Sequence, residues 1–118
     1  MFRKRYQRDY SPRERKIMNL KRKLTRLKRD VLSKRFETEE EYFSGIKECL
    51  RVLFKIKYEF TPEELMHEIG RSRIKRETKV KLIEFVKRME LMEYGSRNIE
   101  KEKVAHLIDE LKEIIGEM

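Results

Sequence analysis

Apolar residues recur at intervals of three and four along most of this chain, which is the repeat of an α-helix that buries one face. The first such stripe consists of Ile17, Leu20, Leu24, Leu27 and Val31. No segment shows the strict alternation of apolar and polar residues that indicates a half-buried strand. A chain of 118 residues is the size of one domain. We therefore expect a single all-α domain.

Capping sequences and glycines divide this pattern into separate helices. Residues 11–14 and 61–64 each combine a Ser or Thr cap, a proline at the first helical position and a glutamate three residues after the cap. Thr38 begins a further capping box. Gly70 and Gly95 are placed to end the third and fourth helices.

These boundaries predict a five-helix bundle with a long basic N-terminal helix and short connections. We expect residues 1–10 to be a basic arm, residues 11–35 the basic helix, and residues 38–118 the helical core, whose last helix starts near Asn98. The inner face of the fourth helix is expected to include Val80. The predicted core consists of Leu50, Leu53, Phe54, Leu65, Ile69, Leu82, Phe85, Val86, Leu107, Ile108 and Leu111.

Positive charge is concentrated at the N-terminal end. The first 35 residues carry 15 Lys and Arg against 3 Asp and Glu, a balance of +12, whereas the whole chain has a net charge of +9. The remaining residues therefore have a balance of −3. Such asymmetry indicates contact with a polyanion, either an anionic membrane leaflet or a nucleic acid. The residues expected to form this footprint are Arg3, Lys4, Arg5, Arg8, Lys21, Arg22, Lys23, Lys28 and Arg29.

The residues themselves leave both polyanions open. Phe2, Tyr6 and Tyr10 lie between the first cationic residues, and such aromatic side chains can stack on bases. Aromatic residues beside Lys and Arg also flank the cytosolic ends of membrane helices. The longest apolar run, residues 52–54, is too short to span a bilayer, and no secretory signal follows the N-terminal charges. We expect a protein that is cytoplasmic or bound at the cytosolic face of a membrane.

A second basic segment lies between the short third helix and the fourth. Basic residues at the start of the second helix of a helix-turn-helix motif contact DNA. This segment contains no Asn or Gln that could read adenine, and its linker looks long for the motif. We keep it as the alternative nucleic-acid contact, formed by Arg71, Arg73, Lys75, Arg76 and Lys79.

The apolar stripe of the basic helix allows two interpretations. It covers about two heptads, whereas a coiled coil is indicated by three to four. Packing of the stripe onto the rest of the domain is therefore favoured. The alternative is self-association through Ile17, Leu20, Leu24, Leu27 and Val31.

Residues that carry catalysis or bind metals are few and scattered. Cys49 is the single cysteine, and His67 and His106 lie far apart without a ligand motif. There is no glycine-rich phosphate loop, and the carboxylates follow the spacing of solvent-exposed Glu and Lys neighbours on helices. We therefore expect no enzymatic activity, no cofactor and no metal site.

From Tyr58 onwards the chain resembles a domain of unknown function found at the cytosolic C-terminal end of membrane-anchored transglutaminase-like proteins. The resemblance rests on the helix start at residues 60–65, the turn at residues 94–95 and the final helix. Where the family has an Arg before the aromatic residue of the turn, this chain has Glu93. The resemblance implies a non-catalytic domain that follows a membrane helix, with a partner in an assembly that includes MoxR-type AAA ATPases.

Charge and resemblance together predict a non-enzymatic helical interaction or adaptor module on the cytosolic side of a membrane-associated assembly. Its expected partners are a protein or an anionic membrane surface. The alternative prediction is a nucleic-acid-binding protein that uses the basic N-terminal segment together with residues 71–79.

Overall fold

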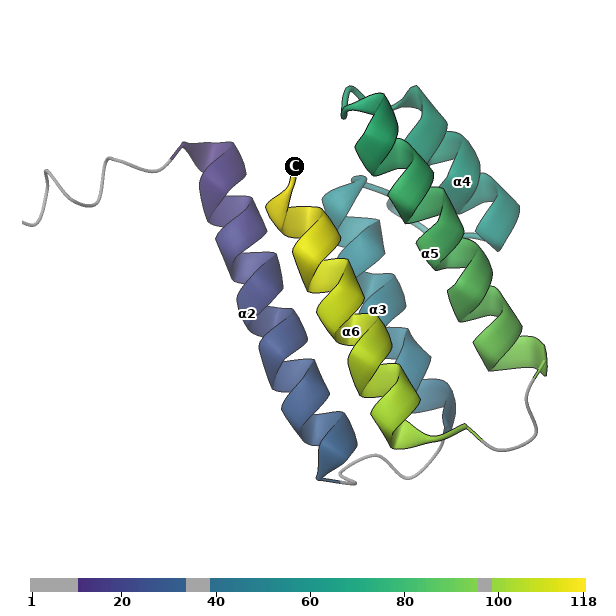
Figure 1. Ribbon diagram of the computed structural model, residues 1–118. Helices are drawn as coiled ribbons and strands as arrows, with labels where there is room; N and C mark the ends of the chain where they lie inside the picture. The colour runs from purple at the N-terminus through teal and green to yellow at the C-terminus, as the bar shows by residue number, and fades with distance from the viewer. Residues whose placement is uncertain (1–10, 34–38, 96–98) are drawn as a thin grey trace, which may run out of the picture.

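The structure is a computed structural model that describes residues 11–33, 39–95 and 99–118. This part of the chain forms helices and no strand, which confirms the all-α prediction. The expected basic arm, the Thr38 capping box and Asn98 lie outside the described residues. The helices are α2 (Pro12–Leu32), α3 (Glu39–Leu53), α4 (Pro62–Arg71), α5 (Arg76–Gly95) and α6 (Lys101–Gly116) (Figure 1).

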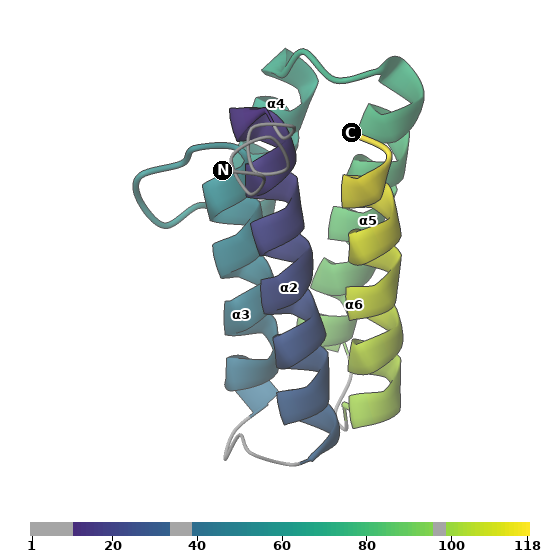
Figure 2. The ribbon, with the colours of Figure 1, turned by 90° about the vertical axis from the view of Figure 1, so that its left-hand side faces the viewer.

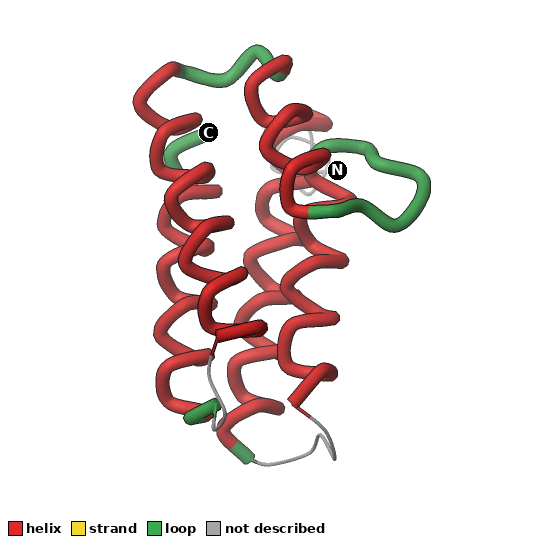
Figure 3. Tube along the Cα trace, turned by 90° about the vertical axis from the view of Figure 1, so that its right-hand side faces the viewer, coloured by secondary structure: helices red, strands yellow, loops and turns green. Residues whose placement is uncertain are grey.

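The four longer helices run side by side, and the short α4 packs beside α5 (Figures 1 and 3). α6 lies between α2 and α5 and contacts both, whereas α3 packs against α2 (Figure 1). Seen from the α2 side, α2 lies in front, with α3 on one flank and α6 on the other (Figure 2). The basic N-terminal helix therefore presents one face to the bundle and the opposite face outward.

Local capping explains where α2 and α4 begin. The Ser11 hydroxyl oxygen accepts a hydrogen bond from the backbone N–H of Glu14 (3.1 Å), and Pro12 takes the first turn of α2. At α4 the box is complete, because Thr61 and Glu64 each bond the other's backbone N–H. Such a capped start is worth about 1 kcal/mol.

The C-terminal boundaries differ in part from those expected. α2 ends at Leu32, where the Ser33 hydroxyl donates to the carbonyl oxygen of Arg29 (2.8 Å). Gly70 does not end α4, which continues to Arg71; the Ser72 hydroxyl then donates to the carbonyl oxygen of Ile69 (2.6 Å). In both cases the backbone N–H of the same serine also donates to that carbonyl oxygen (3.0 Å for Ser33, 3.2 Å for Ser72). The serine therefore closes the last turn by itself, so neither end requires a glycine.

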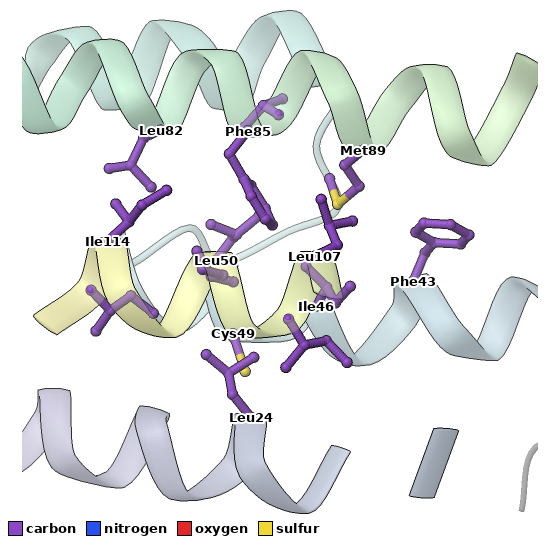
Figure 4. Packing of buried hydrophobic residues seen from close by; sticks show 14 of the residues in the cluster. Leu24, Phe43, Ile46, Cys49, Leu50, Leu82, Phe85, Met89, Leu107 and Ile114 are labelled. Carbon is purple, nitrogen blue, oxygen red and sulfur yellow. The ribbon is translucent and has the colours of Figure 1, made fainter. Parts of the chain in front are cut away.

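The core joins side chains of the five described helices, with Leu65 and Ile69 from α4. Members from α2, α3, α5 and α6 are labelled in Figure 4. Leu24, Cys49 and Leu50 lie between α2, α3 and α6, while Phe85 extends from α5 toward them (Figure 4). The predicted core is confirmed except for Leu53, the last residue of α3, and Phe54 directly after it, which are only partly buried and line a groove described below. Further buried residues are Leu20, Leu24, Val31, Phe43, Ile46, Cys49, Met89, Val104, Ile114 and Ile115.

The apolar stripe of α2 packs within the chain. Leu20, Leu24 and Val31 are at most 1% exposed, and Ile17 and Leu27 pack against the same core. These side chains are therefore covered by the chain's own helices. The intramolecular interpretation of the stripe agrees with this burial, and the stripe does not offer a free surface to a second copy.

Apolar residues on α5 are not confined to the buried side. Val80, expected on the inner face, is 48% exposed, and Leu91 and Tyr94 are also exposed. One side of α5 is covered by α4 and α6, so only residues on that side, such as Leu82 and Phe85, are buried. Within the described residues, no helix is both long and apolar enough to cross a membrane.

Candidate functional site: a cationic helix face and the groove beside it

The outward side of α2 carries four exposed arginines, which we call the arginine face: Arg15, Arg22, Arg26 and Arg29. The spacings of seven, four and three residues place them on one line, opposite the buried Leu20, Leu24 and Val31. With a rise of 1.5 Å per residue, the line from Arg15 to Arg29 is about 21 Å long. None of the four side chains bonds or pairs with another described residue.

The lysines of α2 lie on its two flanks instead. On the α6 flank, Lys28 forms an ion pair with Asp109 (2.7 Å), and the Lys21 amine lies over Gly116 at the end of α6. The C-terminal end of a helix carries partial negative charge, which favours a cation in that place. On the α3 flank, the Lys16 amine donates to the carbonyl oxygen of Leu53 (3.4 Å).

Lys23 also lies on the α3 flank. It contributes to lowering the pKa of Glu48, although the hydrogen bond from Arg51 to that carboxylate is the larger cause. The lysines thus face acidic or carbonyl groups of neighbouring helices, while the arginines face solvent. This separation leaves positive charge along the centre of the outward face of α2, with Asp30, one turn beyond Arg26, at its edge.

The predicted footprint is therefore divided by the fold. Arg22 and Arg29 lie on the arginine face, Lys23 is exposed beside it, and Lys21 and Lys28 turn toward α6. Arg3, Lys4, Arg5 and Arg8 lie outside the described residues. The prediction omitted two members of the face, Arg15 and Arg26. Their spacing from Arg22, opposite the apolar stripe, is the signal in the sequence that identifies them.

Acidic residues elsewhere in the bundle pair away from this face. Glu93 pairs with Lys47 (2.8 Å) and Glu117 with Lys81 (2.8 Å), both on the side of α5. Glu110 of α6 pairs with Arg88 of α5. These carboxylates are neutralised within the bundle and do not screen the arginine face.

A groove opens at the end of the bundle where α2 begins and α6 ends, and we call it the end groove. Its volume is about 610 Å³. The start of α2, the end of α3, the α4–α5 linker and the segment after α6 all contribute to its lining. Its apolar lining residues are Ile17, Leu53, Phe54, Ile74 and Met118, and its cationic ones are Arg13, Lys16, Lys55, Arg71 and Arg73.

The end groove carries an excess of positive charge. Glu68 is its one acidic lining residue among the described residues, and its carboxylate is paired with Arg71 (3.2 Å). Burial lowers the pKa of Lys16, and the charge of Lys55 lowers it further. Arg13 donates to the main-chain oxygen of Met118 (3.0 Å). Arg71 and Arg13 thus have oxygen partners, and an anion placed here would meet three cations without an ion pair to a described residue: Lys16, Lys55 and Arg73.

The second basic segment is brought to this groove only in part. Arg71 and Arg73 line it, whereas Lys79 donates to the carbonyl oxygen of Gly70 (2.9 Å) at the end of α4. Lys75 and Arg76 are exposed at the start of α5. The linker between α4 and α5 comprises four residues, a length that helix-turn-helix motifs have, so the expectation that it is too long was wrong.

Groups with catalytic potential are not gathered in the described part of the chain. Burial raises the pKa of the Cys49 thiol to about 11, which disfavours the thiolate. His67 and His106 are both exposed, on α4 and α6 respectively. In the residues that the structure describes, no three His, Cys, Asp or Glu side chains are grouped so that they could hold a metal ion.

Comparison of the chain with protein-family models, with curated proteins and with solved structures gives no match. The resemblance of residues 58–118 to a cytosolic domain of membrane-anchored proteins therefore stays a prediction.

Proposed function

We propose that this protein is a non-enzymatic helical interaction module that attaches to an anionic membrane leaflet through the arginine face. The observation that carries the proposal is the exposure of four arginines along one line of α2, without an ion pair to any other described residue. The remainder of the bundle is then free to hold a protein partner.

The shape of the face suits a leaflet. A straight line of cations about 21 Å long can meet an extended charged surface with all its members at once. The apolar side of α2 is buried in the core, so attachment would be electrostatic and would not insert the helix. The resemblance to a cytosolic domain that follows a membrane helix points in the same direction.

The size of the attraction follows from the number of charges. Each Lys or Arg close to an anionic leaflet contributes about 1 kcal/mol, so the arginine face contributes about 4 kcal/mol. That corresponds to a change of about 1,000-fold in the partition coefficient. Such binding is reversible and weakens as salt screens it.

Sedimentation with vesicles tests the proposal. The protein is mixed with phosphatidylglycerol or phosphatidylcholine vesicles at 0.15 M salt, and the bound fraction is measured. We expect binding to the anionic vesicles alone. Replacing Arg22, Arg26 and Arg29 with Gln removes about 3 kcal/mol and should lower the partition coefficient about 150-fold.

A matched variant separates the face from net charge. Lys57, Lys87 and Lys103 are exposed on other parts of the bundle, and their replacement with Gln changes the net charge by the same three units. We expect this variant to bind within about twofold of the original protein. If both triple variants lose binding equally, net charge and not the arginine face controls attachment, and the proposal is wrong.

A nucleic acid is the second candidate, and the choice of arginine over lysine on the outward face favours it. A guanidinium group binds a phosphate through two parallel hydrogen bonds, and a phosphodiester backbone carries phosphates at regular intervals. Asn19 is the only amide side chain in α2, so base reading would be poor and binding would follow the backbone.

Titration of labelled duplex and single-stranded oligonucleotides tests this second candidate. Four phosphate contacts predict a slope of log K against log salt of about −3.6 for duplex DNA, and removing one arginine should reduce its magnitude by about 0.9. Binding to duplex with this slope, together with no binding to anionic vesicles, would replace the membrane proposal. No binding to either oligonucleotide at low salt would remove the nucleic acid.

A further inference from the structure

The end groove is lined by both apolar and cationic side chains, and none of them belongs to the arginine face. The apolar side chains, among them Leu53, Phe54 and Ile74, are partly buried and border the core without being covered by it. The cationic side chains come from segments that are far apart in the sequence, for example Lys16 and Arg73. The groove shares no residue with the arginine face.

We propose that the end groove binds a single-chain anionic amphiphile, such as a fatty acid or an alkyl phosphate. The alkyl chain covers the apolar lining, and the anionic headgroup meets the cationic side chains. The proposal goes beyond attachment to a leaflet and does not depend on it, because the ligand is one molecule held in a groove and not a surface.

Charge complementarity identifies the class of ligand. Five cationic residues line the groove; Arg71 pairs with Glu68 and Arg13 bonds the main-chain oxygen of Met118, which leaves Lys16, Lys55 and Arg73 for a ligand. The Lys16 amine has three N–H donors, and its one hydrogen bond to a described residue, with the Leu53 carbonyl oxygen, is long at 3.4 Å. Donors are thus available to an oxyanion, in a place where burial has already weakened the hydration of an ammonium group.

The apolar lining excludes an inorganic anion as the whole ligand. A phosphate ion would satisfy the cations and would leave Ile17, Ile74 and Met118 in contact with water. The volume of about 610 Å³ lies within the range of small-molecule sites, about 300–1,000 Å³. A neutral hydrocarbon would fill the space and would leave Lys16, Lys55 and Arg73 without an anionic partner.

The chain's own N-terminal segment does not have the required charge. Residues 1–10 contain four basic residues and one acidic residue, so they would meet like charge in the groove. An amphiphile with a negative headgroup has complementary charge at one end and complementary surface at the other.

Titration with dodecyl phosphate below its micelle concentration tests the proposal. Binding is followed by calorimetry and by the methyl NMR signals of Met118, Ile17 and Ile74. We expect saturable one-site binding that moves these signals. Shortening the chain from dodecyl to decyl and octyl should weaken binding about fourfold per methylene removed.

Three probes of the same kind isolate the two halves of the ligand. Inorganic phosphate tests the headgroup alone, dodecyl maltoside tests the chain alone, and dodecyltrimethylammonium reverses the charge. We expect each to bind at least tenfold more weakly than dodecyl phosphate. Equal binding of any one of them would overturn the proposal, as would shifts of methyl signals spread over the whole core, which indicate unfolding by a detergent.

Variants place the ligand in the groove. The double replacement Lys16→Gln and Arg73→Gln should weaken dodecyl phosphate binding at least tenfold. A thermal unfolding curve of this variant checks that the variant folds. The matched double replacement Arg22→Gln and Arg26→Gln, on the arginine face, should leave binding unchanged. Equal loss in both would overturn the proposal.

Two further measurements complete the test. Should the Lys16 and Arg73 variant not fold, Ile74→Gln provides a second change to the lining. Because Ile74 is one of five apolar lining residues, this replacement should weaken dodecyl phosphate binding and reduce the chain-length dependence in part. Binding and chain-length dependence equal to those of the original protein would overturn the proposal. Dilution of the ligand-free protein should leave the three methyl signals in place. Movement on dilution would show that a second copy occupies the groove, which also contradicts the proposal.

Discussion

Gly45 lets α2 approach α3 closely, and this contact, together with the larger one to α6, holds the arginine-bearing helix to the bundle. A Cβ atom added at Gly45 would lie 2.6 Å from Cδ1 and 2.8 Å from Cδ2 of Leu27. Gly45 is within α3, where alanine is otherwise favoured over glycine by about 1 kcal/mol. The replacement Gly45→Ala therefore sets a gain in helix propensity against a loss in packing.

The distances indicate that packing decides the sign. The atoms below 3.0 Å are the two methyl groups of Leu27, and its Cγ is also close at 3.3 Å. Because Leu27 packs against the core, moving it is overpacking, which costs about 1–3 kcal/mol. We expect Gly45→Ala to lower the free energy of unfolding by about 1 kcal/mol. Truncating Leu27 to Ala removes the obstacle, so Gly45→Ala in that background should raise the free energy of unfolding by about 1 kcal/mol. The coupling between the two sites is then about 2 kcal/mol.

Urea unfolding followed by far-UV circular dichroism measures these differences, provided that the slope with denaturant is the same in all variants. Gly70 supplies the matched control, because it is also helical and a Cβ atom added there meets nothing within 4 Å. Gly70→Ala should stabilise by about 0.5–1 kcal/mol. If Gly45→Ala in the original chain stabilises as much as Gly70→Ala does, the close approach of α2 and α3 is refuted.

Three further predictions concern single side chains. Lys55 has a left-handed backbone (φ 56°) just after α3, so Lys55→Gly should raise the free energy of unfolding by about 0.5–1 kcal/mol in urea, whereas Lys57→Gly nearby should not. Burial raises the pKa of Cys49 to about 11, so about 0.1% of the thiol is thiolate at pH 8. Its reaction with a disulfide reagent should therefore require unfolding, and fast reaction of the folded protein would contradict this burial. Burial alone would lower the pKa of Lys47, yet the hydrogen bond and charge of Glu93 raise it above 10.5. The ion pair therefore makes its full contribution to the stability of the folded protein below pH 10.5, and the contribution is lost as pH rises through the folded-state pKa. Lys47→Met should cost about 1–3 kcal/mol at pH 7, and an unchanged unfolding midpoint there would count against the pair.

The positions of the helices were predictable because the signals are local. A capping residue and a proline lie within a few residues of the helix they start, as at Ser11 and Thr61, and the spacing of apolar residues reports the helical repeat directly. The exposed side of α5 was harder to predict. Val80 and Leu91 have the same apolar character as Leu82, and only the placement of α4 and α6 decides which of them is covered.

The candidate site, too, was predictable from local sequence only in part. That α2 is basic follows from composition, and that it has one apolar stripe follows from spacing. Which cations stay free does not follow from either, because Lys28 and Arg29 are neighbours in the chain. The first pairs with Asp109, which is 81 residues away, and the second faces solvent.

The amino-acid sequence by itself determined the helical class of this protein, the starts of its capped helices and the concentration of positive charge at its N-terminal end, because each depends on residues close together in the chain. Only the tertiary structure decided which charges remain on the surface and where a groove opens. Both depend on how α2 is rotated against α3 and α6, and on segments around Lys16, Arg73 and Met118 that meet only when the bundle closes.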